Sequence, residues 1–316
     1  MSRTPEELLY DRLLTVANEG SVACGCFLAS LQAVDRSAIY TSLLFERLRR
    51  KMHIVKDLRE EANRNWNQTF YLLYFRTLGD QQNQAAYLDL ARRVPYRIVL
   101  RERLTPHAIE AMFFGASGLL DLYPSDSYTE RLRSEFAHLK EKYDIEPMDA
   151  QQWILREVRP ANHPVLRLAQ AAEFFLQDDF LMDRILLCCT EEDVCKLFCI
   201  EAGDYWLTHD IPGSEGRPRP KRLGAFKANI IGINLVVILQ FAYGFFGGYI
   251  RYQEQALELL QRLPAEDNRY TRLWHAEGIK PQDAFESQAL LQLITEHCLH
   301  QDCRQCLLAK RMVERL

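Results

Sequence analysis

The sequence predicts an all-α protein: a multi-helix globular bundle with a buried apolar helix pair at its centre. Three observations support this fold class. Apolar residues recur at helical spacing along nearly the whole chain, several segments carry helix-start patterns, and only residues 96–104 have even a weak resemblance to a strand. The chain has 316 residues, of which 48% are apolar and 26% charged, an ordinary balance for a folded globular protein.

Helices are expected throughout the first half. Thr4 as N-cap, Pro5 at the first helical position and two glutamates in the first turn favour a helix that starts here, and Gly20 suits its end. Apolar or aromatic stripes at helical spacing predict further helices over residues 43–62, 66–75, 105–115 and 132–143.

Prolines interrupt the middle of the chain, at Pro147 and at Arg159-Pro160. They predict a boundary near 148–158, which divides the chain into an N-terminal helical part, 1–150, and a C-terminal helical part, 151–316, with a cysteine-rich end. One continuous domain is the alternative. The second part is expected to contain helices after Pro164, after Thr190 and over 253–263 and 282–298, with a Pro- and Gly-rich loop at 211–222.

Residues 228–250 carry no formal charge, and this stretch is long enough to cross a bilayer. The amides of Asn229, Asn234 and Gln240 favour a buried pair of core helices, broken around Gly244–Gly248, because amides in hydrocarbon are costly. The N-terminus has no signal-peptide core, and the cysteines are not spaced as a disulfide scaffold. We therefore expect a soluble cytoplasmic protein without a membrane partner.

The charge of the chain does not indicate a protein held mainly by nucleic-acid phosphates. Lysine and arginine total 39 against 43 acidic residues, a net charge of −4. Two stretches, 47–59 and 217–222, are locally basic, but acidic residues interleave the first. Each stretch either contacts phosphates or is a solvated surface.

Several ordered segments resemble an uncharacterised bacterial family, domain of unknown function 2851. The segments that carry the resemblance are Glu46–Lys51, Trp66, Phe114–Gly118, Arg159–Gln170, Asn229–Gly244, Leu263–Asn268 with Trp274, Ser287–Leu290 and Cys298–Cys306. Val237-Ile238 and Ala309 depart from the family pattern, which has a proline and a glycine there. The resemblance implies that the chain corresponds to the C-terminal region of longer members, whose upstream region has a nuclease-like character. The family has no established activity.

One group of candidate ligand-binding residues surrounds the helix start after residue 162: Arg159, Asn162 and Arg167. Two guanidinium groups and a helix N-terminus could converge on a carboxylate or phosphate. The alternative is that Asn162 caps the helix, Pro164 starts it, and the arginines tie helices together.

A second group consists of Asn234 in the apolar stretch and Glu266, Asn268 and Gln288 downstream. A buried amide requires a partner, so we expect Asn234 to meet some of these groups or the arginines at 159 and 167. The set forms either a ligand pocket or an internal network that fixes helix packing. Glu266 and Asn268 have capping of a following helix as a further alternative.

Cys298, Cys303 and Cys306 are the candidate metal ligands. The Cys-x-x-Cys pair supplies two tetrahedral positions and Cys298 a third, while the fourth ligand is His297, His300 or a remote cysteine. Zinc is the first candidate and an iron–sulfur cluster the second. Unliganded thiols in a helical hairpin are the alternative.

These residues lead to three functional hypotheses. The first is a binding or interaction module with a buried Arg/Asn/Glu cluster. The second is a nucleic-acid-associated accessory of a nuclease-like system. The third, a stand-alone hydrolase that uses Glu266 and His209, has the least support, because no phosphate loop, nucleophile elbow or zinc-protease motif is present.

Overall fold

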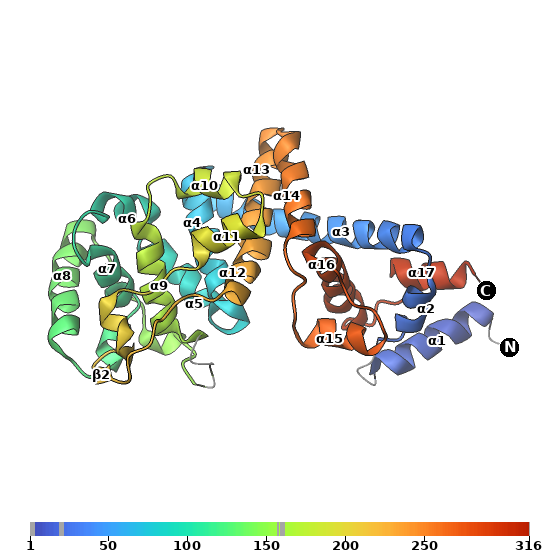
Figure 1. Ribbon diagram of the computed structural model, residues 1–316, viewed down its shortest axis with the longest axis horizontal. Coiled ribbons are helices and arrows are strands. Elements are labelled where there is room, and N and C mark those ends of the chain that lie inside the picture. The colour runs from blue at the N-terminus through green and yellow to red at the C-terminus, as the bar shows by residue number, and fades with distance from the viewer. Residues whose placement is uncertain (1–3, 19–21, 157, 159–161, 316) are drawn as a thin grey trace. The chain divides into compact units, whose positions relative to one another are not determined.

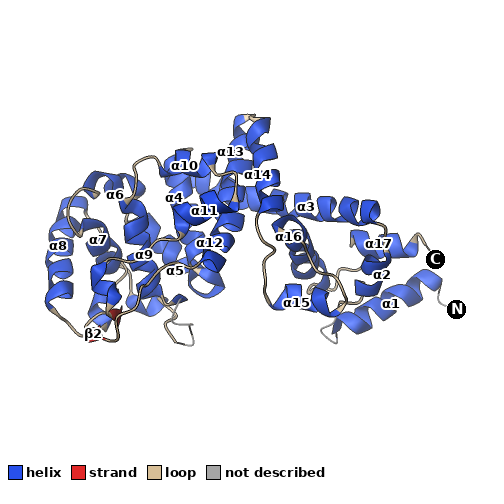
Figure 2. Ribbon diagram, in the orientation of Figure 1, coloured by secondary structure: helices blue, strands red, loops and turns tan. Residues whose placement is uncertain are grey.

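The computed structural model describes residues 4–18, 22–156, 158 and 162–315. Contacts group the chain into two compact units. Unit 1 comprises Met1–Ile54 and Gln253–Leu316, and unit 2 comprises Val55–Tyr252. The proline-containing region around residue 150, where we expected a boundary, therefore lies inside unit 2. Helices dominate both units (Figure 2), which confirms the all-α fold class.

Unit 1 is formed by helices from both ends of the chain (Figure 1). Its elements are α1 (Pro5–Asn18), α2 (Gly25–Ser30), most of α3 (Ala33–Glu61), most of α14 (Ile250–Arg262), α15 (Arg269–Ala276), α16 (Ala284–Gln292), the π-helical segment η6 (Leu293–Cys298) and α17 (Leu307–Val313). The expected start of α1 is confirmed: the Glu7 amide donates to Thr4 Oγ1 at 3.2 Å, and the Thr4 amide donates to Glu7 Oε2 at 2.9 Å.

Unit 2 contains the remaining elements. In chain order they are α4 (Trp66–Leu78), α5 (Asp80–Arg93), α6 (Tyr96–Glu102), α7 (Ala108–Ala116), η1 (Leu119–Leu122), α8 (Ser127–Tyr143), η2 (Ala150–Gln152), α9 (Pro164–Leu176), α10 (Leu181–Leu187), α11 (Glu191–Phe198), η4 (Asp204–Leu207), β1 (His209–Ile211), β2 (Ser214–Glu215), α12 (Ala225–Ile231), η5 (Gly232–Val236) and α13 (Val237–Gly247). Residues 96–104, the weak strand candidate, start instead as helix α6, whose N-cap is Pro95. The expected loop at 211–222 begins inside the small β1–β2 hairpin.

The core of unit 2 is a cluster of aromatic side chains. Phe70, Tyr71 and Phe75 on α4 contact Phe175 on α9 with ring centroids 5.2–6.2 Å apart. Helix α7 is buried along its whole length, and a Cβ at Gly115 would lie 2.1 Å from Phe136 of α8. Glycine at this position therefore allows α7 and α8 to pack closely. This packing brings residues of the two helices next to each other.

The uncharged stretch forms a continuous helical run, Ala225–Gly247, in which η5 is a π-helical turn between α12 and α13. The predicted break is confirmed, since Gly248 ends α13 with φ 73° and α14 follows. By length and composition this run could span a membrane, but 67% of its most apolar window is buried within the structure. Such burial is typical of a core helix in a water-soluble protein.

Candidate functional site

Arg167 and Asn162 lie together at the start of α9, as expected, while Arg159 falls outside the described residues. Arg167 is 4% exposed and donates to Asn162 Oδ1 at 2.7 Å and to Gln170 Oε1 at 2.9 Å. Gln170 in turn donates to the Lys221 carbonyl at 2.9 Å. Asn162 is not the N-cap of α9, a position that His163 holds. These bonds make the arginine part of a packing network between α9 and the 217–222 loop.

The amides of the apolar run bind backbone carbonyls. Gln240, fully buried, donates to the Ile185 carbonyl at 2.9 Å and the Cys188 carbonyl at 2.7 Å, and Asn234 donates to the Ile230 carbonyl one turn earlier in its own helix. Gln240 therefore satisfies two carbonyls at the end of α10.

Glu266, Asn268 and Gln288 converge in unit 1, as the sequence predicted. Asn268 Nδ2 donates to one oxygen of Glu266 and Gln288 Nε2 to the other, both at 2.9 Å. The Asn268 side-chain oxygen also caps α15 through the amides of Tyr270 and Thr271. Burial lowers the pKa of Arg47 to about 10, and the negative charge of the nearby Glu266 partly opposes this lowering. This cluster belongs to a different unit from Asn162, Arg167 and Asn234, so the six described residues of the predicted set divide between the two units.

The three candidate metal ligands also converge, and a fourth cysteine joins them. Cys298, Cys303 and Cys306 line one small cavity together with Cys24, which lies just before α2. Burial raises the pKa of Cys298 to about 12, and the pKa of Cys24 is raised by burial and by the three other thiols. Of the two histidines considered, His297 lines the cavity, whereas His300 is exposed.

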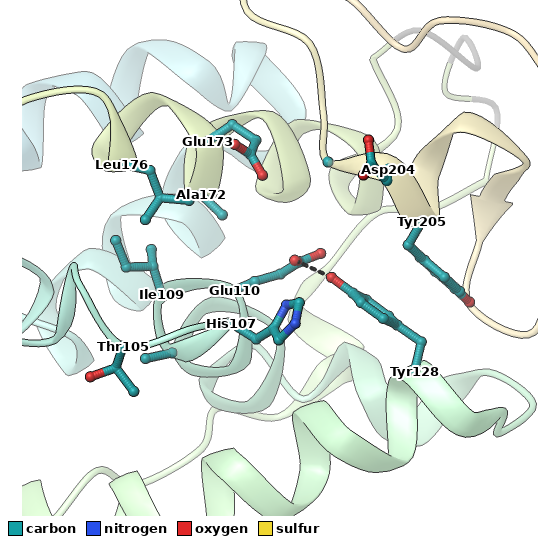
Figure 3. A pocket seen from close by; sticks show the side chains of 12 residues that line it. Thr105, His107, Ile109, Glu110, Tyr128, Ala172, Glu173, Leu176, Asp204 and Tyr205 are labelled. Atoms are coloured by element: carbon teal, nitrogen blue, oxygen red, sulfur yellow. Dashed lines mark hydrogen bonds between the residues drawn. The ribbon is translucent and has the colours of Figure 1, made fainter.

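Unit 2 contains a larger pocket that we did not predict from the sequence (Figure 3). Its volume is about 370 Å³. Helices α7, α8 and α9 and the segment η4 supply its walls, which contain Thr105, His107, Ala108, Ile109, Glu110, Tyr128, Ala172, Glu173, Leu176, Gly203, Asp204 and Tyr205. Three of these side chains are carboxylic acids, and no lysine or arginine is among the described residues that line the pocket.

Glu110 is the buried acid of this pocket, with an exposure of 7%. Tyr128 Oη donates to Glu110 Oε2 and Trp206 Nε1 donates to Glu110 Oε1, both at 2.5 Å. Burial raises the pKa of Glu110 to about 7, because the two neutral donors only partly replace lost hydration. Burial and the nearby charge of Asp204 also raise the pKa of Glu173, which faces the cavity from α9 (Figure 3).

Aromatic rings form the wall of the pocket beside Glu110. Tyr205 stacks between Tyr128, at a centroid distance of 4.1 Å, and His209, at 3.9 Å. The Tyr205 hydroxyl donates to Asp126 Oδ2 at 2.6 Å, which holds this stack in place. His107, which precedes α7, has a left-handed backbone with φ 60°, and such conformations in non-glycine residues concentrate at functional sites.

This arrangement can bind a ligand and exchange a proton with it. An acid whose pKa lies near 7 is present in both protonation states at neutral pH, which is the requirement for proton-linked binding or acid–base chemistry. The apolar side chains of Ile109, Ala172 and Leu176 suit the carbon skeleton of a small organic molecule.

Glu110 and Cys24 are the two important residues that sequence reasoning missed. Glu110 had a signal, since it is the one charged residue in Ala108–Ala116, a segment otherwise apolar and small. A helix that is apolar on all sides is expected to be buried on all sides, so its one carboxylate is buried as well. A buried carboxylate is costly and therefore indicates a specific role. Cys24 had none, because nothing local to it indicates that the two ends of the chain meet in unit 1.

A sequence profile of the family described as protein of unknown function DUF2851 matches residues 2–269, nearly the whole chain. The chain belongs to this family. The match confirms the family resemblance and covers the first half of the chain from residue 2, so the correspondence is not confined to the family's C-terminal region as we expected. The Ser287–Leu290 and Cys298–Cys306 segments lie beyond the matched residues. Comparisons with curated proteins and with solved structures gave no match. In this DUF2851 member, every residue that lines the Glu110 pocket lies within the matched range.

Proposed function

We propose that the protein is a binding module whose ligand site is the Glu110 pocket, and that the ligand is a small organic cation. The observation that carries the proposal is the composition of this cavity of about 370 Å³: it has three carboxyl groups and no lysine or arginine among the described lining residues. Carboxylates attract a cation, and their attraction is stronger where burial excludes water. The proposed binding site is therefore the Glu110 pocket and not the Arg/Asn/Glu cluster that we expected from the sequence.

The buried carboxyl group makes the proposed binding pH-dependent. A cation stabilises the ionised form of Glu110, so its binding lowers the pKa of this group from about 7 and releases a proton. Affinity should therefore rise as the pH increases through 7. A neutral ligand that needs protonated Glu110 as a hydrogen-bond donor would show the opposite trend.

Catalysis by Glu266 and His209 has little support from their surroundings. Glu266 lies in unit 1, where it accepts from Asn268 and Gln288. His209 lies in unit 2, where Nδ1 is 2.9 Å from the Tyr205 carbonyl and the ring stacks on Tyr205. Both side chains are occupied in local packing, which favours a binding role over a hydrolase.

Nucleic-acid association, the second hypothesis, draws less support from the basic stretches. In the 217–222 loop, Arg219 pairs with Asp210 at 2.7 Å and Arg222 donates to the Cys199 carbonyl at 2.9 Å. On α3, Arg50 pairs with Glu296 at 3.1 Å. These cations already have intramolecular acceptors. A cytoplasmic location is part of the proposal, supported by nine free cysteines, which fit a reducing compartment.

Isothermal titration calorimetry on the full chain tests the proposal, with spermidine, agmatine and tyramine as probes and 1,4-butanediol as an uncharged control. We expect at least one cation to bind, and Glu110→Gln to weaken that binding roughly 10- to 100-fold through loss of a charge-assisted contact. Glu141→Gln, an exposed glutamate on α8, is the matched control and should bind like the wild type.

Two results would contradict the proposal. One is that none of the cations binds, or that each binds equally well to Glu110→Gln. The other is tight binding of duplex or single-stranded DNA that weakens steeply with salt, which would favour the nucleic-acid hypothesis.

A further inference from the structure

Four cysteines from opposite ends of the chain surround one cavity in unit 1. Cys24 precedes α2, Cys298 ends η6, and Cys303 and Cys306 occupy the turn that leads into α17. All four line a cavity of about 20 Å³ and all are free thiols. Each thiol alone packs as a small apolar residue, but four thiols around one cavity also supply the complete ligand set of a tetrahedral metal site.

The surroundings of this cavity resemble those of a structural metal site. Trp274 and Leu293 line it and are buried, which gives the cavity an apolar wall.

His297 adds a second, independent feature. Its Nε2 lies 3.0 Å from Glu46 Oε1, whereas its Nδ1 is buried without a hydrogen-bond partner. The same side chain lines the cysteine cavity. An unsatisfied buried nitrogen next to four thiols is explained if a polar or charged species occupies the cavity. Cys298 and His297 both belong to a π-helical segment, and π-helical turns are frequent at functional sites.

We propose that Cys24, Cys298, Cys303 and Cys306 bind a zinc ion that joins the two ends of the chain within unit 1. An all-sulfur set of four suits zinc or an iron–sulfur cluster, and zinc lies about 2.3 Å from each sulfur. A cavity of about 20 Å³ accommodates a single ion far better than a four-iron cluster. Cys24 is thus the remote fourth ligand that the local spacing left undefined.

Zinc binding requires the thiols to converge further than they do in the structure. Among the residues that the structure describes, no three His, Cys, Asp or Glu side chains are grouped closely enough to hold a metal ion. A cysteine reorients its sulfur by rotation about one bond, and the proposal requires such a rotation of these side chains when the metal binds. Metal binding would then rigidify the connection between α2 and α17, and its free energy would stabilise unit 1.

Metal analysis of the full chain, purified without added metal and without a metal-affinity tag, tests the proposal. We expect about one zinc per wild-type chain, loss of that zinc in Cys24→Ser and in Cys303→Ser, and retention in Cys26→Ser. Cys26 is the matched control because it is exposed, lies two residues from Cys24, and does not line the cavity.

A second measurement covers the case in which the serine variants do not fold. Cobalt(II) replaces zinc in the wild-type chain, and four thiolate ligands give it intense charge-transfer absorption that fewer thiolates do not. Wild-type protein without metal, or with weak cobalt absorption, would overturn the site. Iron with an equal amount of sulfide would overturn the choice of zinc, and loss of zinc in Cys26→Ser would overturn the assignment of Cys24.

Discussion

Two glutamates, one in each unit, show how the same side chain serves different purposes. Glu266 in unit 1 accepts from two side-chain amides and faces the positive charge of Arg47. Glu110 in unit 2 accepts from a phenol and an indole, faces no lysine or arginine among the described pocket residues, and borders a cavity of about 370 Å³. The negative charge of Glu266 is balanced by groups of the protein itself, whereas Glu110 borders a cavity in which a ligand could bind.

The comparison teaches that convergence of polar residues is a poor guide to a binding site. Glu266, Asn268 and Gln288 meet as the sequence predicted, yet both oxygens of Glu266 already accept from the other two residues, and Asn268 caps α15. Only Gln288 Oε1 among their described hydrogen-bonding atoms is buried without a partner. A buried charge that the fold leaves poorly compensated, beside open volume, is the stronger indication of function.

The largest effect that we expect from the difference between the two glutamates is a pH dependence of the unfolding free energy due to Glu110. Its pKa is raised from 4.5 to about 7 in the folded protein, so between these values the folded state binds more protons than the unfolded state. The stability that protonated Glu110 provides is complete below pH 4.5 and is lost as the pH rises through 7, a change of about 3 kcal/mol.

Chemical denaturation of wild type and Glu110→Gln across this pH range measures the effect. We expect the difference in unfolding free energy between the two proteins to shift steadily in favour of the glutamine variant from pH 4.5 to 7. Glu141→Gln should keep the wild-type pH profile. A constant difference across the range would mean that Glu110 titrates normally.

A smaller effect is expected in unit 1. Glu266→Ala removes the acceptor of Asn268 and Gln288 and the charge that faces Arg47, so we expect it to destabilise the protein by about 2 kcal/mol. Denaturation at constant pH measures this loss, with Glu254→Ala, an exposed glutamate on α14, as the control. Binding of an organic cation should survive Glu266→Ala; its loss would contradict the separation of the two roles.

Local rules predicted most of the fold. Capping at Thr4, Thr190 and Asn268 follows from short side chains that accept backbone amides, and all three caps are present. The pattern of apolar residues misled us over 96–104, which has a weak resemblance to a strand. Apolar and charged residues mix there, and Pro95 at the N-cap allows helix α6 to begin at Tyr96. Helix caps depend on a few neighbouring residues, which is why sequence alone identifies them.

The candidate sites depend on contacts between distant segments, and these were harder to predict. Three cysteines close in sequence indicated a metal site, but Cys24 joins them only because both ends of the chain belong to unit 1. The Glu110 pocket draws residues from α7, α8, α9 and η4, and none of these segments carries a recognisable motif. Arg167 and Asn234 were expected to share partners; Arg167 donates to Asn162 and Gln170, and one bond of Asn234 goes to the Ile230 carbonyl.

The central claim is that Glu110 titrates near neutral pH and that a cation shifts this titration. Carbon-detected NMR of the glutamate side-chain carboxyl groups measures it directly, with Glu110→Gln to assign the signal. We predict a pKa of about 7 in the free protein and a lower pKa when a saturating organic cation is present. An ordinary pKa for Glu110 in the free protein, or a value that the bound cation leaves unchanged, would contradict the account.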